Sequence, residues 1–148
     1  MIIEIKNKGI DSYVVYNKEE KKNVYIISKK FLMGLKYIIL KDGKKVADIK
    51  KSAYDLKRAD ITIGSTNMGY ISCDWTNRLD VKLFNGWYIS CEKDGYQIRS
   101  YGDIIANVNC KYNVSVKYEV KVANPNSLLC ICATILALDI INYNEEKY

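Results

Sequence analysis

The stretch "NSLLCICATILALDII", residues 126–141, is by far the most apolar segment of this 148-residue chain. From Leu128 to Ile141 only Thr134 and Asp139 are polar, and 3.6 residues per helical turn place those two about 140° apart. No face of such a helix is continuously polar, so it must be surrounded by protein or by lipid. The stretch therefore predicts either a buried helix or a membrane segment.

The length and flanks of the stretch favour the buried helix. Its fourteen residues from 128 to 141 rise about 21 Å, which is short of the roughly 30 Å hydrocarbon core of a bilayer. Asp139 inside lipid would cost several kcal/mol, and the position near the C-terminus excludes an export signal. We expect a helix over about 126–141 with Asn124 as N-cap and Pro125 at the first helical position, and no transmembrane span.

The rest of the chain has a period of two, which is typical of strands. In "VKYEVKV", residues 116–122, the apolar side chains alternate with Lys117, Glu119 and Lys121, which predicts that these three face away from the core. Type I′ hairpin turns, which need positive φ at both central residues, are expected at Asp42-Gly43, Asn85-Gly86 and Asp94-Gly95. The expected strands lie near 12–17, 23–28, 35–40, 44–51, 59–64, 79–84, 87–92, 96–101, 103–112 and 115–122, with shorter ones between them.

A weak internal repeat supports this antiparallel meander. "GLKYIILKDGKKVADIKK" resembles "GYQIRSYGDIIANVNCK" when Ala47 is aligned with Ala106 and Val46 with Ile105. Each segment reads as a glycine, a strand, a turn and a second strand. Chance similarity between two hairpins of one type is the alternative.

Composition bounds the class of protein. The length predicts a single domain over residues 1–148, and five cysteines without framework spacing favour free, mostly buried thiols in a reducing cytosol. The net charge of +6 is uneven: residues 1–58 hold 15 Lys/Arg against 7 Asp/Glu, whereas residues 59–148 hold 8 against 10. A basic first third indicates an anionic partner.

Three segments together resemble the Tubby C-terminal-like superfamily, and more closely its LURP-one-related proteins and their small bacterial members. They are "FLMGLKYIILKDGKKVADIKK", "WYISCEKDGYQIRSYGDIIANVNCKY" and "YEVKVANPNSLLCICATILALDII". The resemblance spans essentially the whole chain and implies a closed antiparallel barrel of about twelve strands around a central hydrophobic helix. It implies function only by analogy, since related tubby proteins bind phosphoinositide headgroups.

The sequence offers little chemistry for catalysis. Histidine is absent, which removes the commonest general base and metal ligand, and Cys130 and Cys132 lie two apart on the expected helix and cannot share a metal. No phosphate-binding glycine motif or calcium loop is present. We therefore expect no catalytic site, no metal and no cofactor. Asp139 is expected to hydrogen-bond backbone or a lysine near the helix end; the alternative is a buried acid of raised pKa.

Lysine pairs in the basic third are the remaining lead. Lys44, Lys45, Lys50 and Lys51 are our candidate ligand-binding residues for an anionic headgroup, because lysines at strand ends can converge on one rim of a barrel. The alternative is that these lysines only form a solvated, lysine-rich surface and bind no ligand. We expect a non-catalytic, cytoplasmic protein that binds anionic phospholipid peripherally at a membrane surface. The alternative is a protein-interaction module that uses Trp75 and Trp87; nucleic acid is disfavoured, because base-stacking aromatics and arginines are not clustered.

Overall fold

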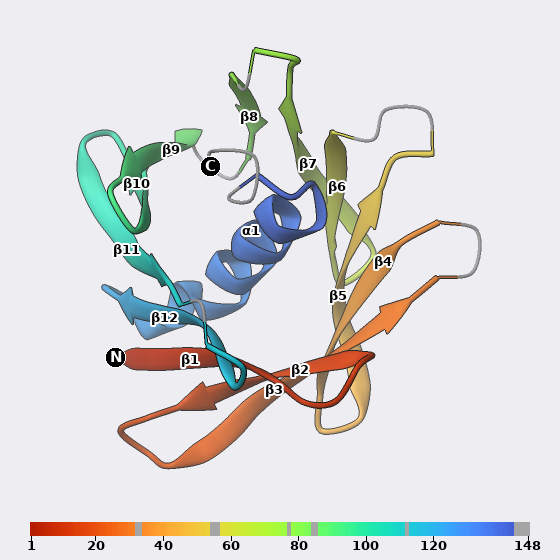
Figure 1. The fold of residues 1–148 in the computed structure, drawn as a ribbon, viewed down its shortest axis with the longest axis vertical. Helices are drawn as coiled ribbons and strands as arrows, with labels where there is room; N and C mark the ends of the chain where they lie inside the picture. The colour runs from red at the N-terminus through yellow and green to blue at the C-terminus, as the bar shows by residue number, and fades with distance from the viewer. Residues whose placement is uncertain (32–33, 54–56, 77, 84–85, 112, 144–148) are drawn as a thin grey trace.

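A computed structural model describes residues 1–31, 34–53, 57–76, 78–83, 86–111 and 113–143, and in them twelve strands surround one helix (Figure 1). The strands are β1 Ile2–Asn7, β2 Ser12–Asn17, β3 Lys22–Lys30, β4 Lys36–Lys41, β5 Lys44–Lys51, β6 Arg58–Ile63, β7 Thr66–Cys73, β8 Leu79–Lys82, β9 Trp87–Glu92, β10 Gly95–Ser100, β11 Asp103–Cys110 and β12 Val116–Val122. The helix, α1, spans Leu128–Ile140 and follows a short 3-10 turn at Pro125–Ser127.

The strands form one antiparallel meander that is nearly closed. The pairing order runs from β8 back to β1, crosses to β12, and continues through β11 and β10 to β9. This crossing joins the first strand to the last, with Ile3 opposite Val120. Among the described residues no ladder joins β8 to β9, so a seam remains there, and Tyr143 hydrogen-bonds Cys91 of β9 beside it. The expected mainly β barrel around a C-terminal helix is confirmed, with closure interrupted at this seam.

Helix α1 lies inside the barrel and packs chiefly against β5 and β6. Every residue from Ile131 to Ile140 is buried, as an all-apolar surface requires. The hydroxyl of Thr134 donates to the carbonyl of Cys130 at 2.8 Å. This bond satisfies one of the two polar side chains of α1. The Asn124 side chain accepts from the backbone N–H of Asn126 at 3.0 Å, so it caps the 3-10 turn and α1 begins two residues later than expected.

The expected hairpins form, but their turns differ. Asp42 and Gly43 have φ of 51° and 77°, as a type I′ turn requires. In the β9–β10 hairpin the turn is one residue earlier and Gly95 already belongs to β10, without positive φ. A Cβ at Gly95 would lie 1.9 Å from the Val108 carbonyl oxygen, so close approach of β11 requires this glycine. Asn85 and the expected strand ends at 84 and 112 lie outside the described residues.

β-Bulges give the two similar segments the same local structure. In the β4–β5 hairpin Ile39 pairs with Ala47 and Leu40 with Lys45, so Val46 is the extra residue. In the β10–β11 hairpin Ile98 pairs with Ala106 and Arg99 with Ile104, so Ile105 is the extra residue. These pairings align the residues that the sequence comparison aligned.

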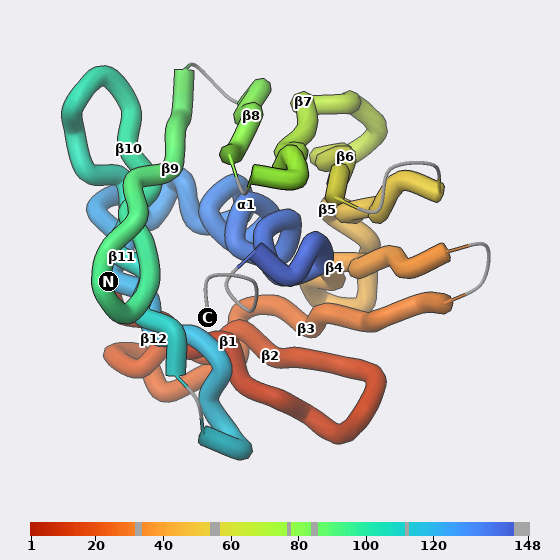
Figure 2. Tube along the Cα trace, turned by 45° about the horizontal axis from the view of Figure 1, so that its top comes forward, coloured from red at the N-terminus to blue at the C-terminus, as the bar shows by residue number. Residues whose placement is uncertain are grey.

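The direction of the helix distinguishes the two ends of the barrel. In an antiparallel meander alternate hairpin loops lie at the same end, so the β1–β2, β3–β4, β7–β8 and β11–β12 connections share one end with the C-terminus of α1. We call this end the helix-end rim. Figure 2 looks obliquely toward it, with the dark blue end of α1 in the middle and these connections around it.

Two further sequence expectations concern the helix and the thiols. No helix among the described residues is long and apolar enough to cross a membrane. All five cysteines are free thiols. Cys73, Cys110 and Cys132 are buried, whereas Cys130 is half-buried and Cys91 is exposed.

Candidate functional site

Three lysines lie side by side on the outer face of the barrel next to the helix-end rim. Lys30 is directly opposite Lys36 in the β3–β4 ladder, and Lys36 is directly opposite Lys50 in the β4–β5 ladder. Residues opposite one another point to the same face, and neighbouring strands are about 4.8 Å apart. We call these three residues the lysine row. It concentrates three positive charges within about 10 Å along the sheet.

The lysine row is an unfavourable arrangement for the unliganded protein. Like charges directly opposite each other destabilise a sheet, by roughly 0.2–1 kcal/mol per pair. Within the part of the chain that the structure describes, none of the three lysine side chains forms an ion pair or a hydrogen bond. Asp60, directly opposite Lys50 on β6, instead accepts from Arg58 at 3.2 Å. An anion bound over the row would relieve the repulsion.

Our four candidate lysines are divided between the two ends of β5. Lys44 and Lys45 lie at the Asp42-Gly43 turn, whereas Lys50 and Lys51 lie at the opposite end of this eight-residue strand. At about 3.3 Å per residue the two ends are about 23 Å apart, which is too far for one headgroup. The Lys45 ammonium also pairs with the Asp48 carboxylate at 2.6 Å.

The pair at the helix-end rim is divided again by the strand itself. Lys50 is exposed on the outer face, while Lys51 follows the buried Ala47 and Ile49 in period two and is half-buried at the mouth of the barrel. The structure therefore brings Lys50 together with Lys30 and Lys36 rather than with the other three candidates.

A second charged cluster lies inside the barrel, at the C-terminus of α1. The Asp139 carboxylate accepts from the hydroxyls of Tyr37 at 2.6 Å, Tyr118 at 2.5 Å and Tyr13 at 3.4 Å. The Lys117 ammonium lies 2.7 Å from Asp139 and donates to the Tyr13 hydroxyl at 3.0 Å. Asp139 is thus bound to a lysine near the helix end, as expected.

The orientation of Lys117 corrects one sequence prediction. Period two placed it on the outside, but Ile5 pairs with Tyr118 and Lys6 with Val116, so Lys117 is the extra residue of a β-bulge. Bulges redirect side chains, and this one turns the ammonium inward to Asp139. Burial lowers the pKa of Lys117, but the charge and hydrogen bond of Asp139 outweigh it and raise that pKa above the usual value.

Tyr96 is a useful contrast to the tyrosines of this cluster. Burial raises the pKa of both Tyr96 and Tyr118 well above the usual value. The Tyr96 hydroxyl is buried without a hydrogen-bond partner among the described residues, whereas Tyr118 donates to Asp139. An unsatisfied buried hydroxyl costs stability, and a satisfied one contributes about 1 kcal/mol.

Removing the two hydroxyls should therefore have opposite effects. We expect Tyr96→Phe to leave the free energy of unfolding unchanged or to raise it, because it removes only an unpaired polar atom. Tyr118→Phe should lower it by about 1.5–3 kcal/mol, since its partner is a charged carboxylate. Urea unfolding of the two variants measures the difference; equal losses would contradict it.

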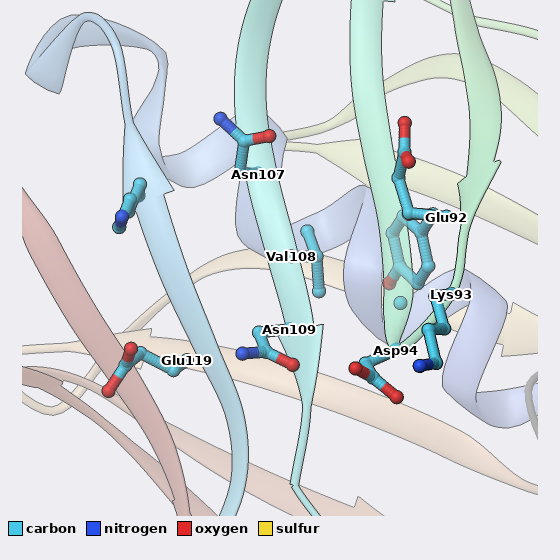
Figure 3. A pocket seen from close by; sticks show the side chains of 10 residues that line it. Glu92, Lys93, Asp94, Asn107, Val108, Asn109 and Glu119 are labelled. Carbon is cyan, nitrogen blue, oxygen red and sulfur yellow. The ribbon is translucent and has the colours of Figure 1, made fainter.

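An open polar groove of about 490 Å³ lies on the opposite wall, over β10–β12 (Figure 3). The groove follows residues that are paired in turn across β9 to β12, namely Glu92, Gly95, Asn109 and Glu119. Carboxylates, amides and lysines mix along its walls. The groove includes no residue of the lysine row and presents no concentrated charge of one sign. Among the described residues no group of three or more Cys, Asp or Glu could hold a metal ion.

The two candidate tryptophans lie in different environments. Trp75, in the β7–β8 connection, is 94% exposed, whereas Trp87 at the start of β9 is buried with 9% exposed. Trp75 is accessible to a partner, and Trp87 contributes to the core instead.

Comparison with known proteins gives a relative by fold. The X-ray structure of a protein from Arabidopsis thaliana, AT5G01750, superimposes with a TM-score of 0.70 at 14% sequence identity, over 95% of this chain and 91% of the other. No protein-family model and no curated protein sequence matches the chain. The comparison therefore defines a class of fold: this chain, with twelve antiparallel strands around a C-terminal helix, has the same barrel fold as the Arabidopsis protein.

Proposed function

We propose that this chain is a non-catalytic barrel of the Tubby-like, LURP-one-related type that binds anionic phospholipid headgroups at a membrane surface through the lysine row. The observation that carries the proposal is the direct opposition of Lys30, Lys36 and Lys50 on three adjacent strands. Ammonium groups bind phosphates as point charges, and each contributes about 1 kcal/mol near an anionic surface.

Co-sedimentation with vesicles tests this function. Lys30, Lys36 and Lys50 are all changed to Gln, and the variant is compared with the wild type on phosphatidylserine-containing and pure phosphatidylcholine vesicles. At about 1 kcal/mol per lysine, we expect the triple variant to bind the anionic vesicles roughly a hundredfold more weakly. Because it loses two like-charged contacts, it should also be more stable than the wild type at low salt, by up to about 2 kcal/mol.

A matched control separates the lysine row from net charge. Lys22, Lys41 and Lys44 are exposed lysines near the opposite end of the barrel, and their change to Gln lowers the net charge by the same three units. We expect this control to bind anionic vesicles within a few-fold of the wild type, since it keeps the row. Equal losses in both triple variants would reduce the effect to general charge. Equal wild-type binding to anionic and neutral vesicles would refute the headgroup function.

A further inference from the structure

Large apolar side chains are exposed at four separate loops of the helix-end rim. Ile10 is 90% exposed in the β1–β2 loop, Phe31 64% after β3, Trp75 94% in the β7–β8 loop and Val114 91% in the β11–β12 loop. At the opposite end, Tyr101 is 84% exposed. The remaining exposed large hydrophobics of the described chain are about 40% exposed. Single exposed apolar residues are ordinary, but their concentration at one end marks an interaction surface.

Two of these side chains are held outward by ordered turns. Asp74 Oδ1 accepts from the Thr76 hydroxyl at 2.6 Å and from the backbone N–H groups of Thr76 at 2.9 Å and Arg78 at 3.0 Å. These hydrogen bonds join the residue before Trp75 to the residues that follow it. Hydrogen bonding from Thr76 lowers the pKa of Asp74. These bonds satisfy the Asp74 carboxylate and two backbone N–H groups in the turn that carries the exposed Trp75 indole.

The β11–β12 loop repeats this arrangement. Asn113 Oδ1 accepts from the backbone N–H groups of Ser115 at 3.1 Å and Val116 at 2.7 Å, and the Val114 carbonyl accepts from the Asn7 side chain at 3.0 Å. A loop whose polar backbone groups are already hydrogen-bonded loses less when it leaves water. The hydrogen-bonded backbone groups of both turns therefore lose less on entering the headgroup layer.

The charges beside these loops identify the partner. Lys30 immediately precedes Phe31. Lys36 is the first residue of β4 and Lys50 the last but one of β5, so both lie at the same rim. A surface that offers negative headgroups to lysines and an apolar layer to four separated loop tips is a lipid bilayer. Tryptophan prefers this interface, because its ring is apolar and its N–H remains wet.

We propose that the helix-end rim docks end-on against an anionic bilayer, with Ile10, Phe31, Trp75 and Val114 inserted among the headgroups. This inference rests on the proposed headgroup function, because the lysine row brings the rim to the membrane, and it adds the orientation and the inserted residues. The barrel axis then stands across the membrane plane.

A change in tryptophan fluorescence on vesicle binding can be assigned to Trp75, because the other tryptophan, Trp87, is buried in the core. On phosphatidylserine-containing vesicles the emission of the whole protein should shift to the blue and its quenching by acrylamide should fall. Trp75→Ser should abolish both changes. Trp75→Ser and Val114→Ser should each weaken vesicle binding by roughly tenfold, the effect of withdrawing one large apolar side chain. Tyr101→Ser, at the opposite end, is the matched control and should bind as the wild type does.

The outcomes distinguish this inference from the function on which it rests. Binding that needs the lysine row, with unshifted Trp75 emission, would overturn end-on insertion and keep the headgroup function. Equal binding to anionic and neutral vesicles without a shift would overturn both. Wild-type vesicle affinity in the Trp75 and Val114 variants would overturn insertion and leave the rim as a protein-docking surface. All of these substitutions are exposed, so thermal unfolding should remain close to that of the wild type.

Discussion

Leu136→Asp is expected to leave no cooperatively folded protein. Leu136 is fully buried at the middle of α1, with 0% of its surface exposed. Removing its side chain costs about 2–5 kcal/mol, and an unpaired carboxyl group in its place adds several more. The total stability of a domain is about 5–15 kcal/mol, so the change removes most or all of it. Circular dichroism should show no sigmoidal thermal transition.

A conservative variant separates the buried charge from a general sensitivity of the helix. Leu136→Met keeps the volume and should cost less than about 1.5 kcal/mol. A helix exposed to lipid would respond differently, because there the aspartate would release a folded protein from membranes instead of unfolding it. Recovery of Leu136→Asp as a soluble protein with a wild-type melting curve would refute the burial of α1 inside the barrel.

The central helix could be predicted because its signal is local and redundant. An apolar run with no polar face, too short for a bilayer and preceded by Asn124 and Pro125, indicates burial without any knowledge of the strands. The two polar residues of the run could also be placed. Thr134 bonds within its own helix, and Asp139 has a lysine partner near the helix end.

The lysine row could not be predicted, because it depends on a bulge. With Lys41 opposite Lys44 at the turn, an unbroken ladder would place Lys36 opposite the inward-facing Ile49. The extra residue Val46 shifts the register by one and places Lys36 opposite Lys50. No local residue preference in "KDGKKVADIKK" marks the bulge, although the aligned position Ile105 in the similar hairpin is also bulged. Grouping lysines by sequence proximity therefore joined residues that lie at opposite ends of one strand.

The same cause hid the partner of Asp139. Period two correctly turned Tyr118 inward, where it donates to Asp139, but it assigned Lys117 to the outside. The bulge opposite β1 turns Lys117 inward. A one-residue irregularity thus decides whether the carboxylate of Asp139 has a countercharge.

Asp139→Asn should be the most destabilising conservative change in the polar residues of the barrel interior. The variant removes the negative charge while keeping the shape, and leaves Lys117 and the Tyr37 and Tyr118 hydroxyls without their charged acceptor. Breaking a buried ion pair costs about 3–5 kcal/mol. Because 32% of the Lys117 side chain is exposed and solvent screens it, we expect about 3 kcal/mol, or roughly 10 °C in melting temperature.

A surface ion pair provides the matched control for this variant. Lys22 and Glu20 are 3.1 Å apart, with 66% and 56% of their side chains exposed. Glu20→Gln removes the same charge and should change the free energy of unfolding by less than about 1 kcal/mol. Urea unfolding of both variants at neutral pH compares them, and similar losses would show that Asp139 acts only as another surface charge.

The pH dependence identifies the ion pair as the cause of the loss. In the wild type Asp139 raises the pKa of Lys117, so its contribution is present at neutral pH and is lost only as alkaline pH deprotonates Lys117. Without Asp139, burial is the largest influence on Lys117 and is opposed only by the weaker hydrogen bond and charge of Tyr13, so we expect that pKa to fall below the usual lysine value of about 10.4. The folded variant then binds fewer protons than its unfolded chain at mildly alkaline pH, so its stability should rise between about pH 8 and 10. The deficit of Asp139→Asn relative to the wild type should therefore shrink over this range, whereas a deficit independent of pH would point to lost packing or neutral hydrogen bonds and contradict the role of the Lys117 charge.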